Sequence, residues 1–174
     1  MNVTQNTIDA LYELITEAFK MNRWLDRWVS VLGVKFAMNN TAQLCHKVGF
    51  AHYYPTLSDA IGDSCLERYN VDVQYGATPE GKEDYNDPKS MIIQLRDKVL
   101  EFQTLYMGAM KIAFENNDFH VYTALSEQME DLSLRSEEAI LMVDKLSIYN
   151  DMGSYDAHIK DYFWVIPIPD EDDD

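Results

Sequence analysis

The sequence predicts an all-α protein, a bundle of four long helices arranged as two antiparallel hairpins. The 174 residues include only 7 Gly and 5 Pro, so residues that break helices are few. Apolar residues recur three or four positions apart through four long segments, which is the spacing of one buried helical face. The connections between the segments are short, long and short, so the long one is a crossover between helices two and three.

The first half of the chain predicts two helices. The first covers residues 7–37 and ends in a polar stretch. Asn40 or Thr41 can cap the second, which covers residues 41–69. Pro55 lies inside this second segment and should kink or interrupt it, because proline lacks the N–H that a helix interior uses.

The second half of the chain predicts an irregular connection followed by two more helices. Residues 71–87 have no helical period and form the crossover. Asp87-Pro88 then starts the third helix, because a carboxylate can cap it and proline suits its first position. This helix ends near residue 115, and after a tight turn at residues 116–118 the fourth helix continues to about residue 149.

The chain is expected to form one bundle domain, residues 1–160, followed by an extended arm, residues 161–174. The arm is apolar, contains two prolines and ends in an acidic run. Two placements are open. The arm folds back along its own bundle with a solvated acidic end, or it docks on a neighbouring subunit.

The charge balance limits the classes of partner. With 30 Asp+Glu against 14 Lys+Arg, the net charge of -16 argues against binding to DNA, RNA or anionic membranes, while cationic partners such as metal ions remain. No apolar stretch approaches the ~18 residues of a membrane span. Two cysteines, Cys45 and Cys65, make no disulfide framework, so a reducing, cytoplasmic location is expected.

Metal chemistry inside the bundle is not expected. A di-iron centre in such a bundle uses Glu side chains and Glu-x-x-His motifs that point into the core. The chain has no Glu-x-x-His, and the apolar stripes of helices three and four include no carboxylate. Glu101 lies opposite its stripe. The acids of helix four are also expected on a solvated outer face: Glu127, Glu130, Asp131, Glu137 and Glu138.

One stretch of helix two combines imidazoles with carboxylates over a few helical turns. The candidate metal ligands are His46, His52, Asp59, Asp63 and Glu67. Asp63 and Glu67 are four residues apart, so they share one helical face and could share a hard cation. These ligand types suit iron, with manganese or zinc as alternatives. The other interpretation is a kinked helix with a solvated polar face.

Residues 46–59 resemble a segment of the Dps-type mini-ferritins, a branch of the ferritin-like superfamily. In that family a His is followed eight residues later by an aromatic residue and then by an aliphatic–His–acidic triplet. Four residues fall on this pattern without gaps: His46, Tyr54, Leu57 and Asp59. Lys47 stands where the family has Trp, and Ser58 replaces the second metal-ligand His, so the site would be divergent.

The resemblance implies a ferritin-like fold and iron bound between subunits, with His from one chain and an Asp-x-x-x-Glu pair from the other. Asp63 and Glu67 have the form of that pair, although they come earlier in the chain than the family pattern would put them. It also implies a homo-oligomer, a dimer or a larger shell, that serves iron binding, iron oxidation or peroxide protection. Ferroxidase activity is expected if metal binds.

An alternative from a different class is a non-catalytic ferritin-like structural or interaction module without a metal site. Ser58 and the carboxylate-free stripes favour it. Self-association fits both hypotheses, because helix three is apolar on almost every side and therefore predicts burial against a second subunit. A third hypothesis, a bundle that binds an apolar small molecule, has no specific motif behind it.

Overall fold

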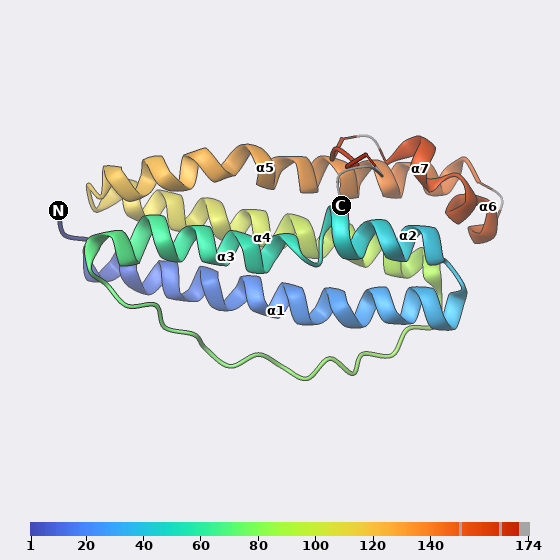
Figure 1. Cartoon of the computed structure of the whole chain (residues 1–174), viewed down its shortest axis with the longest axis horizontal. Helices are drawn as coiled ribbons and strands as arrows, with labels where there is room; N and C mark the ends of the chain where they lie inside the picture. The colour runs from blue at the N-terminus through green and yellow to red at the C-terminus, as the bar shows by residue number, and fades with distance from the viewer. Residues whose placement is uncertain (150, 164, 171–174) are drawn as a thin grey trace.

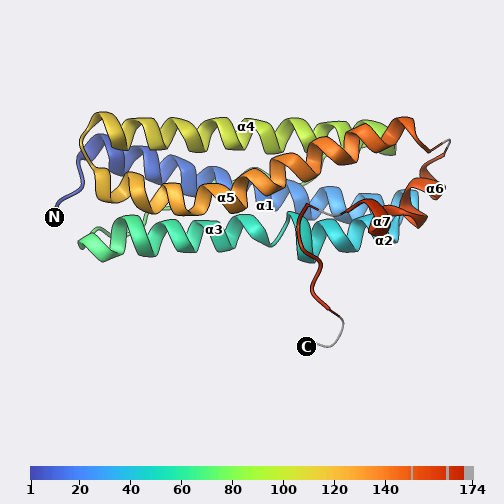
Figure 2. The same cartoon turned by 90° about the horizontal axis from the view of Figure 1, so that it is seen from above.

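The four-helix bundle predicted from the sequence is confirmed. The computed structural model describes residues 1–149, 151–163 and 165–170. Within these residues, four long helical segments lie side by side along one axis, with a long crossover between the second and the third (Figure 1). The second segment and α4 (Pro88–Glu115) occupy opposite corners of the bundle, as the view from above shows (Figure 2).

The first bundle helix, α1 (Gln5–Phe36), lies against both α4 and the second segment. Its buried face repeats every three or four residues and includes Leu11, Leu14, Ile15, Ala18, Leu25, Trp28 and Leu32. Burying each of the larger apolar side chains stabilises the fold by about 1.5–3 kcal/mol. The Trp28 indole N–H also donates to the carbonyl of Met91 in α4 at 2.9 Å, which fixes the relative height of the two helices.

The second bundle position is interrupted. It consists of α2 (Asn39–Gln43), a π-helical turn (Leu44–Gly49), α3 (Tyr53–Ile61), a second π-helical turn (Gly62–Leu66) and a 3₁₀ turn (Glu67–Tyr69). Pro55 lies in the first turn of α3, so the break expected from it falls just before, at residues 50–52. Pro55 has no N–H for the Ala51 carbonyl, and the Asn22 side chain of α1 donates to that carbonyl instead, at 2.8 Å.

The expected cap of this segment is wrong. Asn40 and Thr41 lie inside α2, and neither caps it with its own side chain. The cap comes from Asp156 in α6 (Met152–Ala157), whose carboxylate accepts the backbone N–H of Thr41 at 2.7 Å and its hydroxyl at 2.8 Å. A residue 115 positions further along the chain therefore accepts a backbone N–H that has no acceptor within this helix.

The crossover lies along α1 in an extended form (Figure 1). The Tyr12 hydroxyl donates to the carbonyl of Asp72 at 2.8 Å, and the N–H of Gly76 donates to the Thr16 hydroxyl at 2.9 Å. A side chain at position 76 would force the Thr16 side chain to shift, because a Cβ there would lie 2.8 Å from the Thr16 methyl group. These contacts hold the crossover against the outer side of α1.

The start of α4 agrees with the sequence. Asp87 accepts the backbone N–H groups of Lys89 at 3.3 Å and Ser90 at 3.1 Å, as expected of a cap followed by proline. The turn after α4 also forms where it is expected, with Asn117 in the left-handed region at φ 61°. The next helix, α5 (Phe119–Asp144), ends earlier than predicted and gives way to a 3₁₀ turn (Lys145–Ser147).

Part of the described C-terminal segment packs on the same chain, whereas residues 167–170 are exposed. After α6 and α7 (Ile159–Tyr162), Phe163 and Ile166 are 2% and 3% exposed, and the Phe163 ring meets the Phe50 ring edge to face. Residues 164 and 171–174 of the predicted arm lie outside the described residues. In the part of the chain that the structure describes, no helix is long and apolar enough to cross a membrane.

Candidate metal centre

The break in the second bundle segment brings two of the predicted ligands together. His46 lies in the π-helical turn after α2 and His52 lies just before α3, and their ring centres are 4.5 Å apart. The His46 Nε2 atom is also 3.8 Å from the Asp26 carboxylate of α1. Asp26 was not among the predicted residues. The antiparallel pairing of helices one and two around residue 38 is the signal that could have found it.

The three predicted carboxylates lie further along the same segment. Asp59, Asp63 and Glu67 are all exposed, and with the exposed His52 they follow one side of α3 and the turns after it. We call His46, His52, Asp59, Asp63 and Glu67 the outer stripe. Its imidazoles lie at one end and its carboxylates at the other.

The described residues of one chain do not supply a complete set of metal ligands. Among the described residues, no group of three or more His, Cys, Asp or Glu side chains is placed to hold a metal ion. The outer stripe by itself therefore does not fit a resident metal. Completing a site there would require side chains from a second molecule.

The remaining residues of the 46–59 pattern belong to the core. Tyr54 and Leu57 are buried, and the Tyr54 ring lies 4.9 Å from the Phe102 ring of α4. Ser58 is 3% exposed and its hydroxyl faces α1, 3.4 Å from the Ile15 carbonyl oxygen. Position 58 therefore faces the chain's own bundle rather than the outer stripe.

The expectation that every acid of helix four is solvated is wrong for Glu138. This side chain is 0% exposed. Its carboxylate accepts the backbone N–H groups of Val165 at 2.7 Å and Ile166 at 3.0 Å, so the C-terminal segment covers it. Glu138 acts as an anchor for that segment, and the sequence pattern of α5 alone gives no sign of it.

Neither cysteine offers a reactive thiolate. Cys45 and Cys65 are free and buried. Burial raises the pKa of both thiols, in the case of Cys65 to about 11 despite a hydrogen bond with Ser64 that lowers it. The two thiols are therefore protonated at neutral pH, which argues against nucleophilic or metal-ligand roles.

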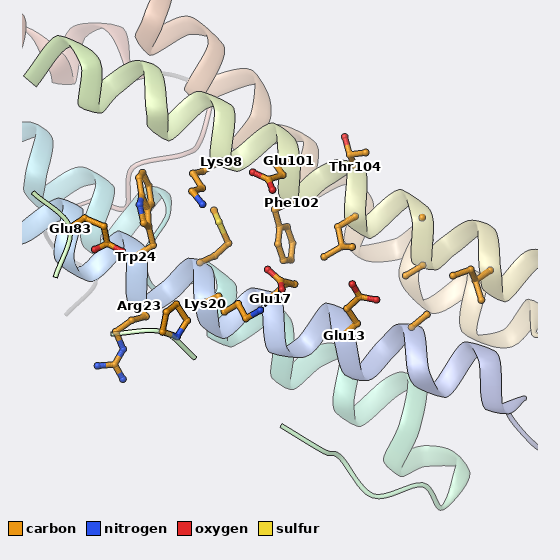
Figure 3. Close-up of a pocket in the computed structure, with 17 residues that line it drawn as sticks. Glu13, Glu17, Lys20, Arg23, Trp24, Glu83, Lys98, Glu101, Phe102 and Thr104 are labelled. Carbon is orange, nitrogen blue, oxygen red and sulfur yellow. Dashed lines mark hydrogen bonds and ion pairs between the residues drawn. The ribbon is translucent and has the colours of Figure 1, made fainter. Parts of the chain in front are cut away.

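A groove of about 650 Å³ lies between α1 and α4. Its wall includes Trp24 and Phe102, and its rim carries charges of both signs. Figure 3 shows Glu13, Glu17 and Lys20 on the α1 side, and Lys98 and Glu101 on the α4 side. The Glu17 carboxylate pairs with Lys20 at 2.7 Å, and the Lys98 ammonium lies 5.8 Å from the centre of the Trp24 ring.

Comparisons with known proteins identify the fold. No protein-family model matches the chain, and no curated protein matches it in sequence. The open-pore ferritin of the hyperthermophilic archaeon Archaeoglobus fulgidus has a similar structure, with a TM-score of 0.83 at 11% identity over 93% of this chain and 98% of that one.

Two further archaeal ferritins have structures similar to this chain. A humanized archaeal ferritin has a TM-score of 0.83 at 10% identity, covering 94% of this chain and 98% of that one. An engineered closed form of the Archaeoglobus fulgidus ferritin has a TM-score of 0.83 at 11% identity, covering 97% and 100%. The chain therefore has the ferritin-like fold. At these identities the likeness establishes the fold alone.

Proposed function

We propose that this chain is a ferritin-like protein that associates with copies of itself and binds ferrous iron, as its substrate, between two of them. The observation that carries the proposal is the outer stripe, in which imidazoles and carboxylates occupy opposite ends of one exposed face. The ferritin-like fold, the net charge of -16 and the Dps-type pattern of residues 46–59 support it.

Two-fold symmetry makes the stripe self-complementary. If two copies pair antiparallel about an axis level with Leu57, His46 comes within one residue of the level of Glu67 of the second copy, and His52 within one residue of the level of Asp63 of the second copy. The imidazole end of each copy then lies beside the carboxylate end of the other, and the symmetry gives two equivalent contacts. Nitrogen and oxygen donors of this kind suit ferrous iron, and manganese or zinc are the alternatives.

The residues of the outer stripe have different roles in binding iron. Asp63 and Glu67 attract the cation and hold it with oxygen atoms, while His46 and His52 offer ring nitrogens. The Asp26 carboxylate beside His46 orients that ring. Oxidation of the bound iron by peroxide or oxygen, and with it a role in peroxide protection, follows the Dps-type resemblance.

A second candidate function is a ferritin-like structural or interaction module without a metal site. The burial of Ser58 against α1 favours it, because the second ligand position of the Dps pattern is then unusable. Both functions include self-association, so iron binding is the property that distinguishes them.

Iron binding and oxidation test the proposal directly. Ferrous iron is titrated into the purified protein without oxygen, and oxidation is followed by absorbance after peroxide is added. The double variant His46→Ala, Asp63→Ala should lose iron affinity by about tenfold or more, since even residues behind a metal ligand change affinity by about that much.

The control for this experiment is Glu127→Ala, which removes an exposed carboxylate of α5 that is not part of the stripe. It should bind iron like the unaltered protein. If the unaltered protein binds no iron and oxidises none above the buffer blank, the iron proposal fails and the interaction module stands.

A further inference from the structure

The solvent side of α4 carries a line of apolar side chains. Ile93, Met107 and Phe114 are 38%, 45% and 54% exposed, and Leu100 between them is half-buried. We call these four residues the α4 seam. They are spaced by seven positions, nearly two helical turns, so they form an almost straight line along the helix.

The α4 seam is separate from the core that α4 already shares with its own bundle. The buried face of α4 contains Ile92, Leu95, Val99, Phe102 and Tyr106. In the described residues, Ile93 and Met107 are open to solvent, and Phe114 stays 54% exposed although its ring lies 5.4 Å from the Phe119 and Tyr122 rings of α5. Seven-residue spacing of apolar side chains is the pattern with which one helix packs along another.

We propose that the α4 seam packs against α4 of a second copy, antiparallel, about a two-fold axis beside Thr104. In this register, Ile93 faces Phe114 of the second copy and Leu100 faces Met107 of the second copy. Every seam residue thus meets an apolar partner. Gly108, near the axis, leaves open space in which another helix can approach closely.

The exposed charges favour the antiparallel register. Asp97 comes level with Lys111 of the second copy, on the same side of the seam, and the symmetry repeats this pair. Both side chains are largely exposed, at 62% and 74%, and their contacts within the chain, to Arg96 and Glu115, are also at the surface. A parallel pairing in register would instead set each charge against its own like charge.

The proposed contact would enlarge the assembly. The α4 seam and the outer stripe lie at opposite corners of the bundle (Figure 2), so a chain can use both at once. Two different two-fold contacts on one subunit build an assembly larger than a dimer. The inference shares self-association with the proposed function but does not depend on iron, so the tests below measure no iron.

A cysteine close to the axis tests the register. In Thr104→Cys, the introduced thiol lies next to its own copy, so mild oxidation should give a disulfide-linked dimer within minutes on a denaturing gel. The native cysteines do not compete, because both are buried. The matched control, Glu115→Cys, is also exposed on α4 but lies far from the axis, and it should cross-link at least about tenfold more slowly.

Charge reversal tests the pairing itself. Asp97→Lys and Lys111→Asp should each lower the sedimentation-velocity mass at a fixed protein concentration, and the double reversal should restore it. Circular dichroism checks that every variant keeps its helix content. Equal cross-linking rates for the two cysteine variants, or a double reversal that stays as dissociated as the single ones, would overturn the proposal.

Discussion

Glu138 holds the C-terminal segment of the chain to the bundle. Its carboxylate is buried on α5 and accepts two consecutive backbone N–H groups, of Val165 and Ile166. Backbone donors buried in this way need a partner, because leaving one without a partner costs about 1–3 kcal/mol. One side chain therefore satisfies a segment that has no helix or sheet of its own at those residues.

We expect Glu138→Ala to lower the free energy of unfolding by about 2 kcal/mol or more, since it removes the acceptor of both N–H groups. Glu138→Gln keeps one side-chain oxygen and should lose less. Glu137→Ala is the control, because Glu137 is its exposed neighbour on α5. Urea unfolding followed by circular dichroism measures the differences. Equal stability of the Glu138→Ala and Glu137→Ala variants would show that Glu138 is no anchor.

The candidate site could be predicted in part, and the reason lies in how far apart its residues are in the sequence. Asp59, Asp63 and Glu67 share a helical face, and spacing along one helix is enough to find such a set. Asp26 reaches His46 only because two helices pair, and Glu138 is buried only because a distant segment returns to it. The periodicity of a single helix predicts neither the contact of Asp26 with His46 nor the burial of Glu138.

Helix starts also differ in whether the residues that determine them are close together in the sequence. The start of α4 was found because its signal, Asp87-Pro88, is local and its cap bonds stay within three residues. The cap of α2 is not found from the sequence because it is Asp156, 115 residues beyond Thr41. Long helices and their connections can thus be read from periodicity and local caps, whereas the π-helical turns of the second segment depend on contacts across the bundle.

The break in the second segment depends on a pair of residues on different helices. Ala51 is 0% exposed, and its carbonyl accepts from the Asn22 amide because Pro55 cannot donate to it. We expect Asn22→Ala to cost about 1–2 kcal/mol of unfolding free energy in the natural chain. In a Pro55→Ala background, an N–H at position 55 can bond the Ala51 carbonyl, so the same change should cost close to nothing.

A double-mutant cycle measures this coupling from four urea unfolding curves: the natural chain, Asn22→Ala, Pro55→Ala and the double variant. A coupling of about 0.5 kcal/mol or more supports the link between the two residues. Strict additivity of the two changes would contradict it. The exposed Thr56→Ala, one residue further along α3, is the control for altering this turn without touching the Ala51 carbonyl.

At the scale of the whole molecule, the two proposed contact surfaces, one polar and one apolar, are separated. The outer stripe lies on the second segment, while the α4 seam lies at the opposite corner of the bundle. The two surfaces share no residue, so their contributions to assembly should be independent. A chain that associates only through the stripe, or only through the seam, would stop at a dimer.

This separation predicts how the assembly comes apart. His52→Glu sets a carboxylate against Asp63 of a second copy and should leave dimers held by the seam. Met107→Glu places a charge in the apolar seam and should leave dimers held by the stripe. The combined variant should sediment as a single chain of 20.2 kDa. Gln94→Glu, an exposed change on α4 beside the seam, should keep the full assembly. A combined variant with the mass of the unaltered protein would mean that other surfaces hold the subunits together.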